Sequence, residues 1–167
     1  MYSLRDLEAF CARFYLGYDL LITPYGYTAS FVTIAQGATQ TQNVNIAANA
    51  DFVCIGLRHH VNVGATVGYS VTSKTAPFLR LLITDTGSAE QFTAQAVDLE
   101  NYSRNGVGET PLSYPRIVAG RTALSLSLTN YAPAAETYGV VDIFLNGVLV
   151  RAYSQGAGPA GALRITG

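Results

Sequence analysis

Charged residues are scarce in this chain. Only 13% of the 167 residues are Asp, Glu, Lys or Arg, against roughly 25% in a typical soluble domain. A freely diffusing monomer normally carries more charge, so the shortage suggests that another molecule covers part of the surface. The ten basic and eleven acidic residues are scattered singly and leave a net charge of −1. The basic stripe that phosphate binding requires is missing, so nucleic acid is not an expected partner.

Cysteine and long apolar runs are scarce as well. Cys11 and Cys54 are the only cysteines, and they lie in no CxxC motif and near no paired histidines with zinc spacing. We expect buried free thiols, and neither a metal nor a cofactor. Arg5, Asp6 and Glu8 interrupt any apolar core of a signal peptide, and no run approaches the ~20 residues of a membrane span. The expected place is therefore the cytosol, or a particle assembled there, without a membrane partner.

The sequence does contain a strict alternation within residues 121–130. Three leucines alternate there with three hydroxyl residues: Leu124, Leu126 and Leu128 with Ser125, Ser127 and Thr129. Side chains on a strand point to opposite faces with a period of two, whereas a helix would bring the serines into the core. The pattern predicts a strand with one buried face. Ser125 and Ser127 have no histidine or aspartate at a spacing typical of a catalytic serine. They are therefore interpreted as residues on one face of the strand.

The chain from Ala29 onward shows further β patterns separated by turn signals. Strands are expected at residues 31–35, 41–46, 52–63, 67–72, 78–84, a short return from 92, 121–130 and 138–153. The inward residues of the second and third strands are expected to be Val44, Ile46, Phe52, Cys54, Leu57 and Val61. Gly56 marks a bend or a bulge. Asn146-Gly147 indicates either a two-residue hairpin or a bulge inside one long final strand.

Residues 97–120 differ from the rest, because glycines and Pro111 and Pro115 leave no periodic run. We expect an ordered loop of roughly 20 residues, a length that is often functional. With hairpin connections and no helical crossovers, the fold class is all-β. We expect an antiparallel two-sheet jelly-roll sandwich of about eight strands, with an N-terminal helix and extended arms.

The N-terminus predicts a helix over residues 4–16. Ser3 and Asp6 have the spacing of a capping box, and Gly17 is a plausible stop. One helical face is apolar and comprises Leu4, Leu7, Phe10, Cys11, Phe14 and Tyr15. This face either packs on the chain's own β-domain or docks on a neighbouring subunit, and the sequence leaves both interpretations open.

Two further segments are expected to make contacts. Residues 20–27 are apolar and aromatic but are broken by Pro24 and Gly26, so they form either an extended arm or a strand that covers the sandwich. The Gly-rich end at 154–167 has Leu163 and Ile165 as its anchors. The expected division is thus 1–28 for the helix and arm, 29–153 for the sandwich and 154–167 for the tail. The partner interface is expected at Leu4, Leu7, Phe10, Phe14, Tyr18, Tyr25, Tyr27, Leu163 and Ile165.

Two short motifs could carry chemistry. Residues 82–88 match the aspartic-protease motif, with Asp85 in Asp-Thr-Gly-Ser, but the reaction needs two such aspartates and one copy is present. A turn between two strands is the preferred interpretation. His59 and His60 are adjacent on a strand and point to opposite faces, so they cannot jointly bind one metal. No enzymatic activity is expected.

The order of the β segments carries a family resemblance. The segments are 48–52, 78–88, the short strand at Phe92, 111–116, 124–131 and 141–147. In this order, from about Val32 to Val150, the chain resembles the jelly-roll capsid decoration (cement) proteins of tailed bacteriophages. The helix at 4–16 and the Gly-rich tail are not part of that pattern.

The resemblance implies a virion structural protein on the capsid exterior, made in the host cytoplasm. It would bind the major capsid protein, bridge capsomers and form a homo-oligomer, a dimer or trimer. Deleting residues 1–27 is then expected to abolish capsid binding while the β-domain still folds. The alternative is a fibre- or tail-associated jelly-roll module for a host carbohydrate or receptor. Such a module would require exposed aromatic residues beside carboxylates, or a calcium site, whereas the sequence has no Trp and no Asp cluster.

Overall fold

The computed structural model describes residues 2–64, 76–103 and 110–154. The elements, in chain order, are α1 (Leu4–Phe14), β1 (Tyr18–Ile34), β2 (Thr39–Asn45), β3 (Asp51–Val63), β4 (Leu79–Asp85), β5 (Val97–Asp98), the 3₁₀ helix η1 (Leu99–Asn101), β6 (Thr110–Val118), β7 (Ala123–Asn130) and β8 (Tyr138–Ser154). The strand expected at 67–72 and the expected anchors Leu163 and Ile165 lie outside the described residues.

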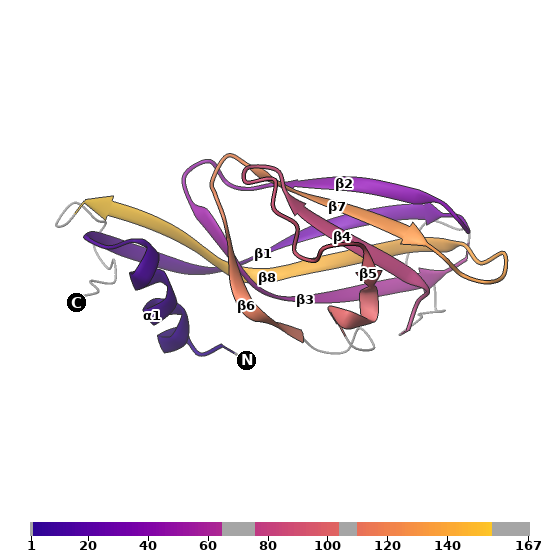
Figure 1. Cartoon of the computed structure of the whole chain (residues 1–167), viewed down its shortest axis with the longest axis horizontal. Coiled ribbons are helices and arrows are strands. Elements are labelled where there is room, and N and C mark those ends of the chain that lie inside the picture. The colour runs from indigo at the N-terminus through magenta and orange to yellow at the C-terminus, as the bar shows by residue number, and fades with distance from the viewer. Residues whose placement is uncertain (1, 65–75, 104–109, 155–167) are drawn as a thin grey trace.

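Two four-stranded antiparallel sheets face each other (Figure 1). The first has the order β1-β8-β3-β6 and the second the order β2-β7-β4-β5. The main hydrophobic core lies between them and draws residues from both sheets. The all-β, two-sheet expectation is confirmed.

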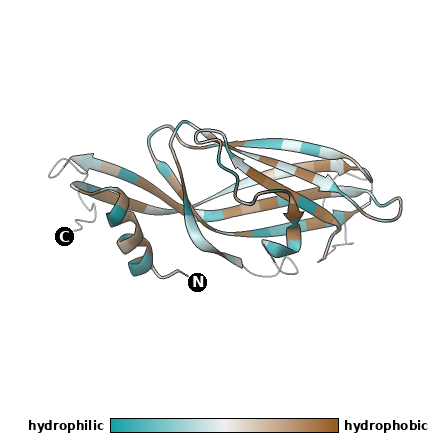
Figure 2. Cartoon of the chain, viewed as in Figure 1, coloured by the Kyte–Doolittle hydropathy of each residue, from teal (hydrophilic) through white to brown (hydrophobic). Residues whose placement is uncertain are grey.

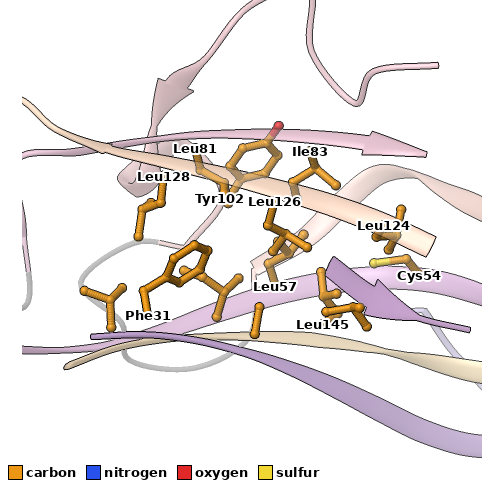
Figure 3. Close-up of a cluster of buried hydrophobic side chains, with 14 of the residues drawn as sticks. Phe31, Cys54, Leu57, Leu81, Ile83, Tyr102, Leu124, Leu126, Leu128 and Leu145 are labelled. Atoms are coloured by element: carbon orange, nitrogen blue, oxygen red, sulfur yellow. The ribbon is translucent and has the colours of Figure 1, made fainter. Parts of the chain in front are cut away.

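β7 has the alternation that its sequence predicts. Leu124, Leu126 and Leu128 are fully buried, while the hydroxyl residues between them are partly exposed. Figure 3 shows the three leucines directed toward Phe31, Leu57 and Leu145 of the opposite sheet. Figure 2 shows the same alternation of hydrophobic and hydrophilic residues along several strands of the sandwich. The expected core residues of β2 and β3 are also buried.

Of the two interpretations of residues 20–27, the structure shows a strand and the extended arm is wrong, because residues 18–34 form the single strand β1. β1 pairs with β8 along its length, from Tyr18 opposite Ser154 to Ile34 opposite Tyr138. The expected boundary at residue 28 therefore falls inside a strand. Pro24 is tolerated because β1 is an edge strand, where a missing N–H can face away from the ladder.

The expected loop at 97–120 is wrong as well. It contains β5, η1 and β6, and β6 is the other edge strand of the first sheet. Pro111 and Pro115 are compatible with this edge position. β6 pairs with β3 at Gly56–Pro111 and at Cys54–Arg116, so residues 112–115 stand opposite Ile55 alone. This bulge pushes part of β6 outward, toward α1.

The final strand β8 is continuous, so Asn146-Gly147 is not a hairpin. The irregularity lies in β3, whose pairing with β8 shifts between Cys54 and Gly56, and Gly56 therefore does mark a bulge. The expected return strand at Phe92 is reduced to one bridge, between Thr84 and Gln91. β5 pairs with β4 instead.

Candidate functional site

α1 begins where the sequence predicts and is fixed by its cap. The Asp6 amide donates to Ser3 Oγ at 3.2 Å, and the Ser3 amide donates to Asp6 Oδ2 at 2.9 Å. The bonds from Ser3 hold the pKa of the Asp6 carboxyl below its usual value. The capping box satisfies amide groups that the first turn leaves without partners. Beside this acidic first turn, the last turn carries Arg13, which suits the helix dipole.

One side of α1 packs on the chain's own first sheet. Leu7 and Cys11 are buried there against residues of β1, β3 and β8, namely Leu20, Ile22, Val53, Val148 and Val150. Burial raises the pKa of the Cys11 thiol to about 11. The structure thus favours the packing interpretation for this side of the helix. Cys11 and Cys54 are both buried free thiols, as expected.

Two tyrosines hold α1 in place. The Tyr2 hydroxyl donates to the Leu112 carbonyl in the β6 bulge at 2.6 Å, and the Tyr15 hydroxyl donates to Asp51 Oδ2 at 2.6 Å. Asp51 Oδ1 also accepts from the Gly120 amide at 2.8 Å. Burial, followed by the bond to Asp51, raises the pKa of Tyr15. The helix is therefore fastened at its start and just past its end, and its outer side has a fixed position.

That outer side meets the β6 bulge in an exposed aromatic surface. The rings of Phe10 and Phe14 lie 4.9 Å apart, and those of Phe10 and Tyr114 lie 5.3 Å apart. Leu4, Phe14 and Tyr114 are 57%, 54% and 57% exposed. We call Leu4, Phe10, Phe14 and Tyr114 the α1–β6 surface. Figure 1 shows α1 beside β6, next to the projecting ends of β1 and β8.

A hollow of about 270 Å³ lies within this surface. Phe10, Tyr114 and Pro115 form its apolar part, and Asp6 and Arg13 contribute one charge of each sign. Aromatic side chains around a hollow, with charges beside them, are typical anchor positions of protein interfaces.

The structure places only some of the expected interface residues on the surface. Leu4, Phe14, Tyr18 and Tyr25 are exposed, and Phe10 is half-buried. Leu7 is wrong as an interface residue, because it is 5% exposed and belongs to the core under α1. Tyr27 mainly serves the sandwich: its ring packs 4.9 Å from that of Phe52, and its hydroxyl accepts from the Ala47 amide.

Tyr114 is an exposed aromatic that is not among the interface residues expected from the sequence. It lies between Ser113 and Pro115 in a segment interpreted as a loop, with no periodic pattern to show which way it points. The aromatic ring between two prolines of an apparent loop was the available signal. Leu16 is a second exposed hydrophobic residue outside the expected interface. The expected helix extends to residue 16, whereas α1 ends at Phe14, and Leu16 is 78% exposed just after it.

The Asp85 motif forms a turn. Asp85 Oδ1 accepts from the Gly87 amide at 2.9 Å, and Oδ2 accepts from the Ser88 hydroxyl at 2.8 Å. Both carboxylate oxygens are thus used within their own turn, as an Asp that starts a turn commonly does.

The two adjacent histidines lie in different environments. His59 is buried, with Nε2 3.6 Å from Glu100 Oε1 of η1. His60 is partly exposed and stands opposite Asp142 of β8. They do not meet at one point, in agreement with the strand geometry. Among the residues that the structure describes, no group of three His, Cys, Asp or Glu is placed to hold a metal.

Within the same described ranges, no helix has the length and apolar character needed to span a membrane. A scan against models of known protein families and a search of curated proteins find no match for this chain. The arguments for its function therefore rest on the chain's own surface and fold.

Proposed function

We propose that the two sheets form a jelly roll. The cross-strand pairs β1–β8, β2–β7, β3–β6 and β4–β5 support this topology. Such pairs arise when one long antiparallel hairpin, β1–β4 against β5–β8, is rolled up. Pairing of β8 with β3 and of β7 with β4 then completes two four-stranded sheets, the arrangement of the double Greek key.

We further propose that the chain is a virion structural protein that decorates the capsid exterior. It binds the major capsid protein, bridges neighbouring capsomers and acts as a small homo-oligomer. The observation that carries this proposal is the α1–β6 surface, which exposes aromatic and aliphatic side chains from a rigidly fastened helix. The low charge of the chain and the resemblance of its β segments to cement proteins support the same proposal.

A decoration protein stabilises a shell by binding the assembled state in preference to free capsid subunits. Mass action then shifts the equilibrium toward the shell. Bridging two capsomers adds avidity, because the second contact forms at a high effective concentration. This role requires a rigid body with an exposed anchor residue. Aromatic anchors commonly supply most of the binding free energy of a protein interface.

The test changes the anchor and leaves the cores intact. We expect the variant Leu4→Gln/Phe14→Gln/Tyr114→Gln to lose at least about tenfold in affinity for shells of the major capsid protein encoded with this chain, since interface anchors are each worth about 2 kcal/mol. Co-sedimentation with purified shells, read by quantitative mass spectrometry, measures the occupancy.

The matched control is Val32→Gln/Phe78→Gln. It changes two other exposed hydrophobic residues, 47% and 40% exposed, of which Val32 lies near the far end of β1 from α1. We expect it to keep the wild-type occupancy. Equal occupancy of the anchor variant and this control would disprove the α1–β6 surface as the shell contact. No binding of the wild-type chain to shells would disprove the decoration role itself.

A further inference from the structure

A second hollow, of about 340 Å³, opens at one side of the sandwich. It lies between β6, an edge strand of the first sheet, and the segment that carries η1. Its lining includes Phe92, Thr93, Asn101, Tyr102, Ser113 and Arg116. Its volume is at the lower end of the range for small-molecule sites, so it suits a small ligand.

Of the described residues that line the hollow, Arg116 alone carries a charge, on its guanidinium. Arg116 is exposed, and its guanidinium carbon lies 5.7 Å from the centre of the Phe92 ring. Within the described part of the chain it has no ion-pair partner. Two other exposed arginines lie over aromatic rings: Arg58 over Phe144, and Arg80 over Tyr131. Of these, Arg80 is paired with Asp98 at 3.2 Å. Among the described residues, Arg116 is therefore a cation without an ion-pair partner, and none of the lining residues that the structure describes is a carboxylate.

The floor of the hollow presents an oriented hydroxyl. The Thr93 hydroxyl donates to the Gln95 carbonyl at 2.8 Å, so the Tyr102 hydroxyl, 3.2 Å away, donates to Thr93 Oγ1. The remaining lone pairs of the Tyr102 oxygen can accept a hydrogen bond from a ligand. Burial raises the pKa of Tyr102, which keeps this phenol protonated. Figure 3 shows the Tyr102 oxygen on the side of its ring away from Phe31 and Leu57.

We propose that this hollow binds an acidic sugar residue through Arg116. A guanidinium fork matches a carboxylate in geometry and charge. Asn101, Ser113 and Tyr102 offer donors and acceptors for ring hydroxyls, and Phe92 and Tyr114 offer aromatic faces for the apolar side of the ring. A neutral sugar would leave the arginine unpaired, and a simple carboxylate would leave the hydroxyl-binding groups unused. The ligand class is thus a hexuronic acid. The site adjoins the proposed shell contact and shares Tyr114 with it, whereas Arg116 and Phe92 belong to this hollow alone.

The test compares three ligands on the full chain at neutral pH: D-glucuronate, D-glucose and acetate. Binding is measured by calorimetry and by NMR shifts. We expect D-glucuronate to bind at least about tenfold more tightly than D-glucose or acetate, because one charge-assisted bidentate contact is worth roughly that factor. Arg116→Gln is expected to remove the preference over D-glucose.

Arg80→Gln is the matched control, and we expect it to keep the wild-type preference. Equal affinity for D-glucuronate and D-glucose would overturn the proposal, as would an absence of saturable binding. Acetate that binds as tightly as D-glucuronate would mean an anion site that does not recognise a sugar, which also contradicts it. The three-ligand comparison on the wild-type chain decides the case even if a variant folds poorly.

Discussion

At Gly147, β8 passes so close to β3 that no side chain fits between the two strands. A Cβ built on this glycine would clash with the Val53 carbonyl oxygen and lie 2.7 Å from Cε2 of Phe52. The ring of Phe52 is fully buried and in contact with Tyr27, so it has little room to turn away. The glycine is required by this close approach and not by a turn, although Asn-Gly is a typical turn sequence.

We therefore expect Gly147→Ala to lower the free energy of unfolding by about 3 kcal/mol, because the clash involves backbone and a packed ring. The matched control is Gly26→Ala on the neighbouring strand, where the nearest atom, the Leu145 carbonyl oxygen, is 3.3 Å from the new Cβ. We expect the control to stay within about 1 kcal/mol of wild type. Urea denaturation followed by circular dichroism measures both. A Gly147→Ala variant as stable as the control would contradict the close approach.

At the scale of elements, α1 and the first half of β1 stabilise the fold in different ways. α1 covers five apolar residues of the first sheet, whereas residues 18–27 are paired with β8. An N-terminal deletion therefore has different consequences on either side of Tyr18. The expectation that the β-domain folds without residues 1–27 has to be corrected, since that deletion removes the outer half of an edge strand.

We expect deletion of residues 1–16 to leave a folded sandwich of reduced stability. The deletion uncovers Leu20, Ile22, Val148 and their neighbours, at roughly 1.5–3 kcal/mol for each large side chain whose cover is lost. Deletion of residues 1–27 should abolish the cooperative transition, because β8 then loses its β1 partner from Leu145 to Ser154. Thermal unfolding followed by near-ultraviolet circular dichroism distinguishes the two. A cooperative transition of similar midpoint for both deletions would show that the sandwich does not depend on residues 18–27.

The elements also show what the sequence could reveal. β7 was predictable because only one of its faces is buried, so its residues alternate. In β3 and β8 the first sheet is covered on both faces, by the second sheet and by α1. Phe52, Val53 and Cys54 of β3 are fully buried, and residues 148–150 of β8 are almost completely buried. Strands covered on both faces read as continuous apolar runs, which do not indicate where each side chain points.

The edge strands were hidden for another reason. β1 carries Pro24, and β6 carries Pro111 and Pro115, residues that usually indicate a break in a strand. At an edge, a residue without an N–H costs little, so tertiary position overrides the local signal. The α1–β6 surface depends on the bulge of β6, so the sequence shows an aromatic ring at Tyr114 but not that it lies beside α1. Its helix half could be found from the sequence, because capping and helical spacing are local properties.

At the scale of the whole molecule, the sheet order leaves little that is free to rearrange. Every described strand except β5 pairs with a strand distant in sequence. The bond from Tyr2 joins α1 to β6, and the bond from Tyr15 joins it to Asp51 at the start of β3. The proposed bridging of capsomers is a property of the assembled shell, so its test is made on shells and not on the isolated chain.

We expect shells saturated with the protein to dissociate at a higher temperature than bare shells, with a shift that grows with the free protein concentration. At a hundredfold excess over Kd, linkage stabilises each occupied site by about 2.7 kcal/mol. Differential scanning calorimetry of shells over a concentration series measures the shift. Mass spectrometry of intact particles gives the copy number, which should be on the order of hundreds if the protein coats the shell and each copy bridges neighbours. A dissociation temperature that is independent of protein concentration, or roughly a dozen copies per particle, would contradict a coat and place the protein at a vertex or tail instead.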